Sequence, residues 1–206
     1  MLIHPWDAGT EESSLAFVKA HEFGHLIAAG RDRAVPVVVP TQFLLADECT
    51  ILLHLARPNP IWAPIEENPK VVMSVAGPWA YIPGGWRAEP GTDPRLGVPT
   101  TYYSSVQLVC HAEIVTETGE KLDILRRQLA GLEADPGDPA AMPRLLSGIR
   151  GLRLAIEEVR GKFKYDGHKD DGHRERVAGH LATRNGPGDA SALTHLGSAV
   201  TDAKSP

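Results

Sequence analysis

Cysteine is scarce in this chain of 206 residues, which contains only Cys49 and Cys110. Two cysteines are too few for the disulfide framework that stabilises many small secreted proteins. The sequence also lacks any apolar run near the roughly 20 residues that a membrane-spanning helix requires. Its first residues do not show the basic and then apolar order of a secretory signal. We therefore expect a cytoplasmic protein that does not bind a membrane.

An excess of positive charge is missing as well. The 21 Lys and Arg residues are outnumbered by 26 Asp and Glu residues, which gives a formal net charge of −5. Nucleic-acid affinity depends largely on neutralising phosphates, so no nucleic acid is expected to bind to this chain alone. Hydrophobic residues make up 42% of the sequence, which is typical of a soluble globular protein able to bury a core.

Short segments that are β-branched, or that alternate between apolar and polar residues, make up much of the chain. Such segments favour β-strands, because successive side chains of a strand point to opposite faces of its sheet. The alternation is clearest where Val106, Leu108 and Cys110 share one face. Pro, Gly and Asp bound most of these segments. The predicted strands cover residues 35–45, 49–56, 70–77, 102–115 and 151–164.

Apolar residues at helical spacing predict three helices. Leu122, Leu125 and Leu129 recur at this spacing in the middle one. The last one is polar, so we expect it to lie on the surface with His173 exposed. The predicted helices cover residues 11–20, 118–133 and 169–183.

These elements predict an α+β fold, in which an antiparallel β-barrel carries peripheral helices. A parallel sheet is not favoured, because few strands are separated by a crossover helix. Residues 1–184 are predicted to form a single domain. Residues 84–99 are rich in Gly and Pro and predict a long loop, whereas residues 185–206 offer little to bury and predict a flexible tail.

One candidate metal site is the sequence His21-Glu22-Phe23-Gly24-His25. On a helix, two histidines four residues apart chelate zinc, and the glutamate activates the bound water of a metalloprotease. Gly24 weakens a helix at this point, and only 20 residues precede His21. Glu48 is a distant candidate for a third ligand, although it fits a hairpin turn better. The competing interpretation is a helix end that leads into a strand.

A second candidate site follows the strand that ends near His54. Here His54, Arg57 and Asn59 emerge together from a turn framed by prolines. Polar groups presented by such a rigid scaffold are typical of a cofactor site. A histidine on a strand is also often a satisfied structural residue, so both interpretations stay open at this point.

Four ordered segments resemble the PaiB-like proteins, a family of FMN-binding negative transcriptional regulators. This resemblance covers most of the chain, and it implies a split β-barrel of the flavin-reductase type. It also implies a homodimer with its cofactor at the subunit interface. The four segments are HLARPNPIW at 54–62, GPWAYIPGGW at 77–86, GVPTTYY at 97–103 and GKFKYDGH at 161–168.

Two of these segments depart from the PaiB pattern within the expected cofactor pocket. Thr101, Tyr102 and Tyr103 stand where Trp-Asn-Tyr is usual, and Phe163 begins a stretch that replaces the usual Leu-Ser-Gln-Asn ending. With these changes the chain resembles the piperazate synthase branch of the family, which holds heme and closes N5-hydroxyornithine into a cyclic hydrazine. The resemblance therefore implies heme as the cofactor, with FMN as the alternative.

The resemblance assigns roles to particular residues. His54 is the expected axial ligand of the heme iron and a catalytic residue, and the heme would be b-type because the sequence contains no C-x-x-C-H. Arg57 is expected to bind a heme propionate or a flavin phosphate. Lys162 and Lys164 are expected to share that role, and Asn59 to line the same site.

Thr101, Tyr102 and Tyr103 complete the expected cofactor and substrate site. Adjacent strand residues point to opposite faces, so one tyrosine would contact the macrocycle while the other directs its phenol to the substrate. Tyr102 is the predicted catalytic residue of the pair. The implied substrate is a small hydroxylated amino acid.

Overall fold

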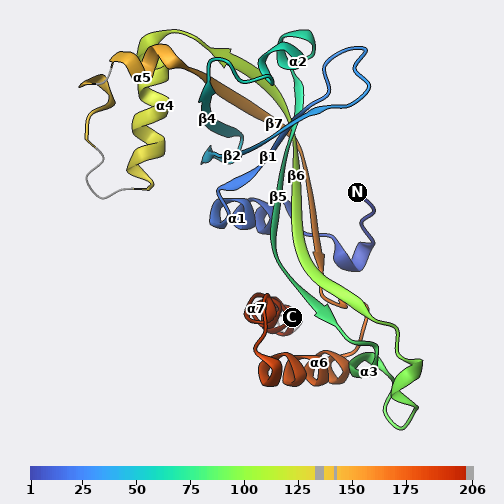
Figure 1. The fold of residues 1–206 in the computed structure, drawn as a ribbon. Helices are drawn as coiled ribbons and strands as arrows, with labels where there is room; N and C mark the ends of the chain where they lie inside the picture. Colours follow the sequence, from blue (N-terminus) through green and yellow to red (C-terminus); the bar gives the residue numbers. More distant parts are fainter. Residues whose placement is uncertain (133–136, 142, 203–206) are drawn as a thin grey trace. The chain divides into compact units, whose positions relative to one another are not determined.

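The computed structural model describes residues 1–132, 137–141 and 143–202 and contains a seven-stranded sheet in the order β2-β1-β5-β6-β7-β4-β3 (Figure 1). The strand pairs with a defined register are antiparallel, which confirms the predicted fold class. No helix in these ranges is long and apolar enough to cross a membrane. The strands are β1 Phe23–Ala28, β2 Val37–Gln42, β3 Leu44–Asp47, β4 Thr50–Ala56, β5 Lys70–Ile82, β6 Thr100–Val115 and β7 Ile149–Lys164.

The α-helices in the described part of the chain include the three that the sequence predicts. The helix predicted over 11–20 is observed with those bounds, and the other two differ from their predictions by a few residues. The α-helices are α1 Glu11–Ala20, α2 Trp62–Glu67, α3 Gly84–Arg87, α4 Thr118–Ala130, α5 Pro143–Gly148, α6 Asp171–Arg184 and α7 Asp189–Asp202.

The strand predicted over residues 35–45 is in fact two strands, β2 and β3. The chain leaves the sheet at Phe43, whose side chain is buried and whose amide donates a hydrogen bond to the Glu22 carbonyl. A buried aromatic anchor with a paired main chain makes the break stable. The periodicity alone shows no interruption at this position.

The described residues fall into two compact units, and each is made of segments far apart in the sequence. One unit contains residues 11–75 and 106–160, and the other contains residues 1–10, 76–105 and the chain from 161 onward. Strands β5, β6 and β7 contribute residues to both units. In the first unit the core consists mainly of fully buried strand residues, including Leu26, Ile51, Leu53, Met73, Leu108, Leu152 and Leu154.

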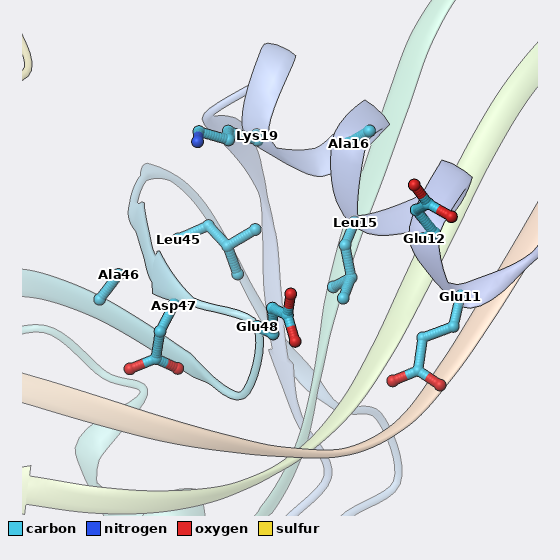
Figure 2. Close-up of a pocket in the computed structure, with 9 residues that line it drawn as sticks. All are labelled: Glu11, Glu12, Leu15, Ala16, Lys19, Leu45, Ala46, Asp47 and Glu48. Atoms are coloured by element: carbon cyan, nitrogen blue, oxygen red, sulfur yellow. The ribbon is translucent and has the colours of Figure 1, made fainter.

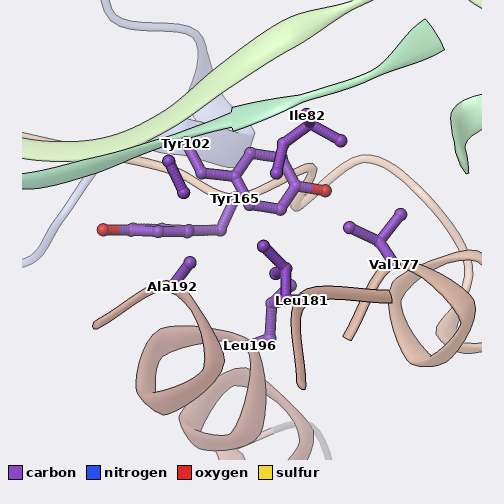
Figure 3. Close-up of a cluster of buried hydrophobic side chains, with 8 residues drawn as sticks. Ile82, Tyr102, Tyr165, Val177, Leu181, Ala192 and Leu196 are labelled. Atoms are coloured by element: carbon purple, nitrogen blue, oxygen red, sulfur yellow. The ribbon is translucent and has the colours of Figure 1, made fainter. Parts of the chain in front are cut away.

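The C-terminal segment is not the flexible tail that its composition predicts. Residues Asp189–Asp202 form helix α7, and Ala192 and Leu196 are buried in a cluster with Tyr102 and Leu181 (Figure 3). The composition, which is rich in Gly, Ala, Ser and Thr, conceals this helix because few of its residues are large and apolar. Residues 203–206 of the predicted tail lie outside the described residues.

Two glycines allow the two ends of the segment predicted as a long loop to approach each other closely. This segment contains the short helix α3 and a 3-10 turn at Pro94–Leu96. A Cβ atom on Gly97 would lie 1.9 Å from the Gly84 oxygen, and one on Gly84 would lie 2.2 Å from the Gly97 oxygen. The two main chains therefore touch directly. At the far end of the segment, Gly91 has no neighbour within 4 Å of its Cβ position.

Candidate functional site

The first candidate metal site does not have the geometry that its motif requires. Helix α1 ends at Ala20, and His25 lies within strand β1, so a helix does not present the two histidines on one face. The predicted transition from helix to strand is confirmed. His21 donates from Nδ1 to the Phe17 carbonyl at 2.9 Å. The described residues contain no group of three or more His, Cys, Asp or Glu side chains placed to hold a metal.

Glu48 lies in the turn between β3 and β4, as the sequence predicts. It helps line a pocket of about 460 Å³ beside helix α1 (Figure 2). The pocket also contains the carboxylates of Glu11, Glu12 and Asp47. Except for Glu48, it contains none of the predicted site residues. Its walls are formed by exposed or half-buried side chains from α1, from β3 and from the β3–β4 turn.

His54 lies on strand β4 between two buried leucines, with its own side chain half-buried. Its Nδ1 is 2.7 Å from Oε1 of Gln128 on helix α4. An amide oxygen only accepts hydrogen bonds, so Nδ1 carries a proton, and in the neutral ring Nε2 carries the lone pair. Among the described residues Nε2 has no hydrogen-bond partner. His54 therefore presents the form of imidazole that binds a metal ion.

Arg57 and Asn59 follow His54 in the same unit. The Nε of Arg57 donates to the Ser147 carbonyl at 3.0 Å, and its side chain is exposed. The two terminal guanidinium nitrogens are thus available to an anion. Asn59 accepts a hydrogen bond from the Ile61 amide at 3.1 Å, which forms the turn before helix α2. Its observed contact is structural.

Four of the other predicted residues lie in the second unit, near the beginning of β6 and the end of β7. Lys162 is buried and donates to the Leu2 carbonyl at 2.8 Å, with its Nζ 5.7 Å from the centre of the Tyr103 ring. Lys164 donates to Oγ1 of Thr100 at 2.7 Å. Thr101 and Tyr103 are half-buried. The structure therefore brings Tyr103 and Lys162 together, whereas His54, Arg57 and Asn59 belong to the other unit.

Tyr102 is completely buried, and its hydroxyl donates to Oδ2 of Asp166 at 2.9 Å. Burial, together with the charge of Asp166, raises the pKa of the Tyr102 phenol far above its ordinary value. The phenol is therefore a hydrogen-bond donor whose proton is held firmly at neutral pH. A catalytic role for Tyr102 stays a prediction.

Asp166 is the centre of a buried network that the sequence does not predict. Arg87 donates to both carboxylate oxygens, at 2.9 and 3.0 Å, and His173 Nε2 lies 3.0 Å from Oδ2. Burial opposes ionisation of Asp166, but the hydrogen bonds from Arg87, Tyr102 and His173 outweigh it and hold its pKa below the ordinary value. His173 is 2% exposed, so the expectation that it lies on the surface is wrong.

The chain matches a family described as "Putative FMN-binding domain" over residues 2–158. The chain belongs to this family. Its resemblance to PaiB-like proteins is confirmed by a curated relative, "Protease synthase and sporulation protein PAI 2" of Bacillus subtilis (strain 168). That relative is 24% identical over 179 residues, which cover 83% of this chain and 84% of the relative.

Solved structures share the fold of this FMN-binding family member. The flavocytochrome Anf3 from Azotobacter vinelandii aligns with a TM-score of 0.60 and 20% identity, over 77% of this chain and 70% of that one. The FAD and heme binding protein from Mycobacterium smegmatis aligns with a TM-score of 0.56 and 16% identity, over 84% and 78% respectively. These similarities establish the split-barrel fold of the chain.

Proposed function

We propose that this chain binds b-type heme with His54 as the axial ligand. The observation that carries the proposal is the hydrogen bond from Nδ1 of His54 to Gln128, which leaves the Nε2 lone pair of the neutral ring without a hydrogen-bond partner among the described residues. Histidine ligands in metal sites characteristically donate their other ring nitrogen to an oxygen acceptor. The donor set thus fits a heme iron, since neutral imidazole is a common axial ligand.

The relatives support a heme or flavin cofactor. The similar structures from Azotobacter vinelandii and Mycobacterium smegmatis are a flavocytochrome and an FAD and heme binding protein. Arg57 is suited to either cofactor, because its free guanidinium edge can bind a propionate or a phosphate. Lys162 already pairs with a main-chain carbonyl, so binding an anion there would require it to exchange a partner.

We further propose a reaction of the piperazate synthase type, in which N5-hydroxyornithine is converted to piperazic acid and water. The N–O bond breaks, the α-amine forms the N–N bond, and the departing hydroxyl leaves as water, so no external oxidant or reductant is consumed. Bound heme would supply a Lewis acid that polarises the N–O bond. The chain would position the two reacting nitrogens, and Arg57 is a candidate partner for the carboxylate of the substrate.

The absorption spectrum of the purified protein tests the cofactor. We expect a Soret band and no flavin absorption, because His54 offers one ligand nitrogen in the required tautomer. The two-band yellow spectrum of a flavin would favour the alternative, a flavin-dependent PaiB-like regulator or oxidoreductase. Protein reconstituted separately with hemin and with FMN provides the matched comparison. Saturable binding of FMN but not of hemin would contradict the proposed cofactor.

We also propose that the chain forms a homodimer. Trp79 and Tyr81 on β5 are 64% and 50% exposed, and they alternate with Ala80 and Ile82, which are buried. Large exposed aromatic side chains on a sheet are typical of protein interfaces.

Light scattering with wild-type protein and a Trp79→Ser/Tyr81→Ser variant tests this proposal. We expect the mass of a dimer for the wild type. For the variant we expect a dimer dissociation constant at least about tenfold higher, since aromatic side chains dominate many interfaces. Leu96→Ser is the control, because this exposed side chain lies in the segment after α3. A wild-type protein that stays monomeric at all concentrations would refute the dimer.

A further inference from the structure

Gln128 is a polar residue on the buried face of an amphipathic helix. Along α4, Lys121, Ile124, Leu125 and Gln128 share the face that is buried. Leucine at position 128 would satisfy the helical pattern and would bury more apolar surface. A buried amide costs free energy unless it forms hydrogen bonds. The position of Gln128 therefore needs a reason beyond the packing of the helix.

The contact with His54 supplies that reason. The Gln128 side chain is 7% exposed, and its Oε1 accepts the Nδ1 proton of His54 at 2.7 Å. Glu117 is the N-cap of helix α4 and accepts a hydrogen bond from the Glu120 amide. The helix packs against β4. The helix and the strand thus hold donor and acceptor in fixed positions. This arrangement orients the histidine ring and selects one of its two neutral tautomers.

We infer that Gln128 is a positioning residue that holds His54 in its ligand tautomer and sets the electron donation of its Nε2. This inference rests on the proposed heme function, because the iron is what His54 would bind. A neutral amide withdraws the Nδ1 proton less than a carboxylate would. His54 therefore acts as a neutral imidazole with little imidazolate character, which favours the ferrous state of the iron more than a carboxylate partner would.

Two substitutions separate positioning from simple packing. Gln128→Leu keeps the volume and removes the acceptor, and Gln128→Glu keeps an oxygen acceptor of nearly the same shape and adds a charge. We expect hemin affinity to fall about 10- to 100-fold in the leucine variant. We expect the glutamate variant to retain hemin and to have a lower reduction potential than the wild type. Arg127→Gln, at an exposed position on the same helix, should change neither quantity.

A measurement on the protein without heme keeps the inference separate from the proposed function. Nitrogen-15 NMR of the His54 ring reports which nitrogen carries the proton, and we expect protonated Nδ1 in wild type and a mixture of tautomers in Gln128→Leu. Protonated Nε2 in the wild type would overturn the positioning role, even if heme binds. The expected tautomer without any hemin binding would instead refute the heme proposal. An unchanged reduction potential of the bound heme in Gln128→Glu would show that the contact between residue 128 and His54 only helps to pack the helix on the strand.

Discussion

Substituting His54 with alanine is expected to abolish tight heme binding and all turnover. Removal of an outer contact to a metal ligand commonly weakens binding 10- to 100-fold, so loss of the ligand itself should exceed about 100-fold. The fold should survive, because His54 is only half-buried and its neighbours Leu53 and Leu55 supply the apolar contacts of the strand. Hemin titration followed by the Soret band measures the effect, and a circular dichroism spectrum verifies the fold.

The matched controls are His21→Ala and His25→Ala. His21 follows helix α1 and is bound to the Phe17 carbonyl, and His25 lies on strand β1. We expect their hemin affinity and spectra to equal those of the wild type. An unaltered Soret band in His54→Ala would overturn the assignment of the ligand, and His111, exposed on β6, would be the next candidate.

Substituting Asp166 with asparagine is expected to destabilise the protein by about 3–5 kcal/mol, the usual cost of leaving a buried charge without its partner. Asparagine can adopt the left-handed backbone of this position, where φ is 53°, so the loss should come from the charge rather than from the main chain. The side chain of Arg87 is only 13% exposed and would lose its counterion. Urea unfolding measures the difference in free energy.

A double substitution tests this explanation. In Arg87→Met/Asp166→Asn both charges are absent, so the destabilisation should be smaller than in Asp166→Asn alone. Equal destabilisation in the two variants would show that the charge of Arg87 is not the cause.

The same carboxylate predicts an acid dependence of stability. The pKa of Asp166 is lower in the folded protein than its ordinary value. The carboxylate therefore contributes fully to stability above its unfolded pKa of about 4. The contribution is lost as the pH falls through the lower, folded pKa. Wild-type stability should therefore decrease more steeply below about pH 4 than the stability of Asp166→Asn. Parallel curves for the two proteins would contradict this.

The antiparallel fold could be predicted from the sequence because alternation along the strands is a local signal. The C-terminal helix could not, since α7 is stabilised by Ala192 and Leu196 packing against Leu181 of α6. Few apolar residues stand among the Gly, Ala, Ser and Thr of this segment, so its periodicity is weak, and only the tertiary contact identifies the core residues. Similarly, the break at Phe43 depends on a partner carbonyl far away in the sequence.

The candidate site was predictable only in part. A histidine followed by Arg57 and Asn59 in a proline-framed turn directs attention to His54, but nothing in the local sequence identifies Gln128, 74 residues away, as its partner. The Asp166 network was missed for the same reason. Its one local signal is that Asp166 stands before Gly167 just after the end of β7, which is typical of a turn and says nothing about Arg87 or His173.

The glycine pair at positions 84 and 97 has a consequence for how this chain can change over evolutionary time. Any side chain at either position would collide with main chain, which has no rotamer by which to move aside. Selection should therefore retain both glycines whatever the cofactor becomes. The turn around Gly91 meets no such restriction. Descendants of this protein should accumulate insertions and deletions at that turn while the paired glycines persist.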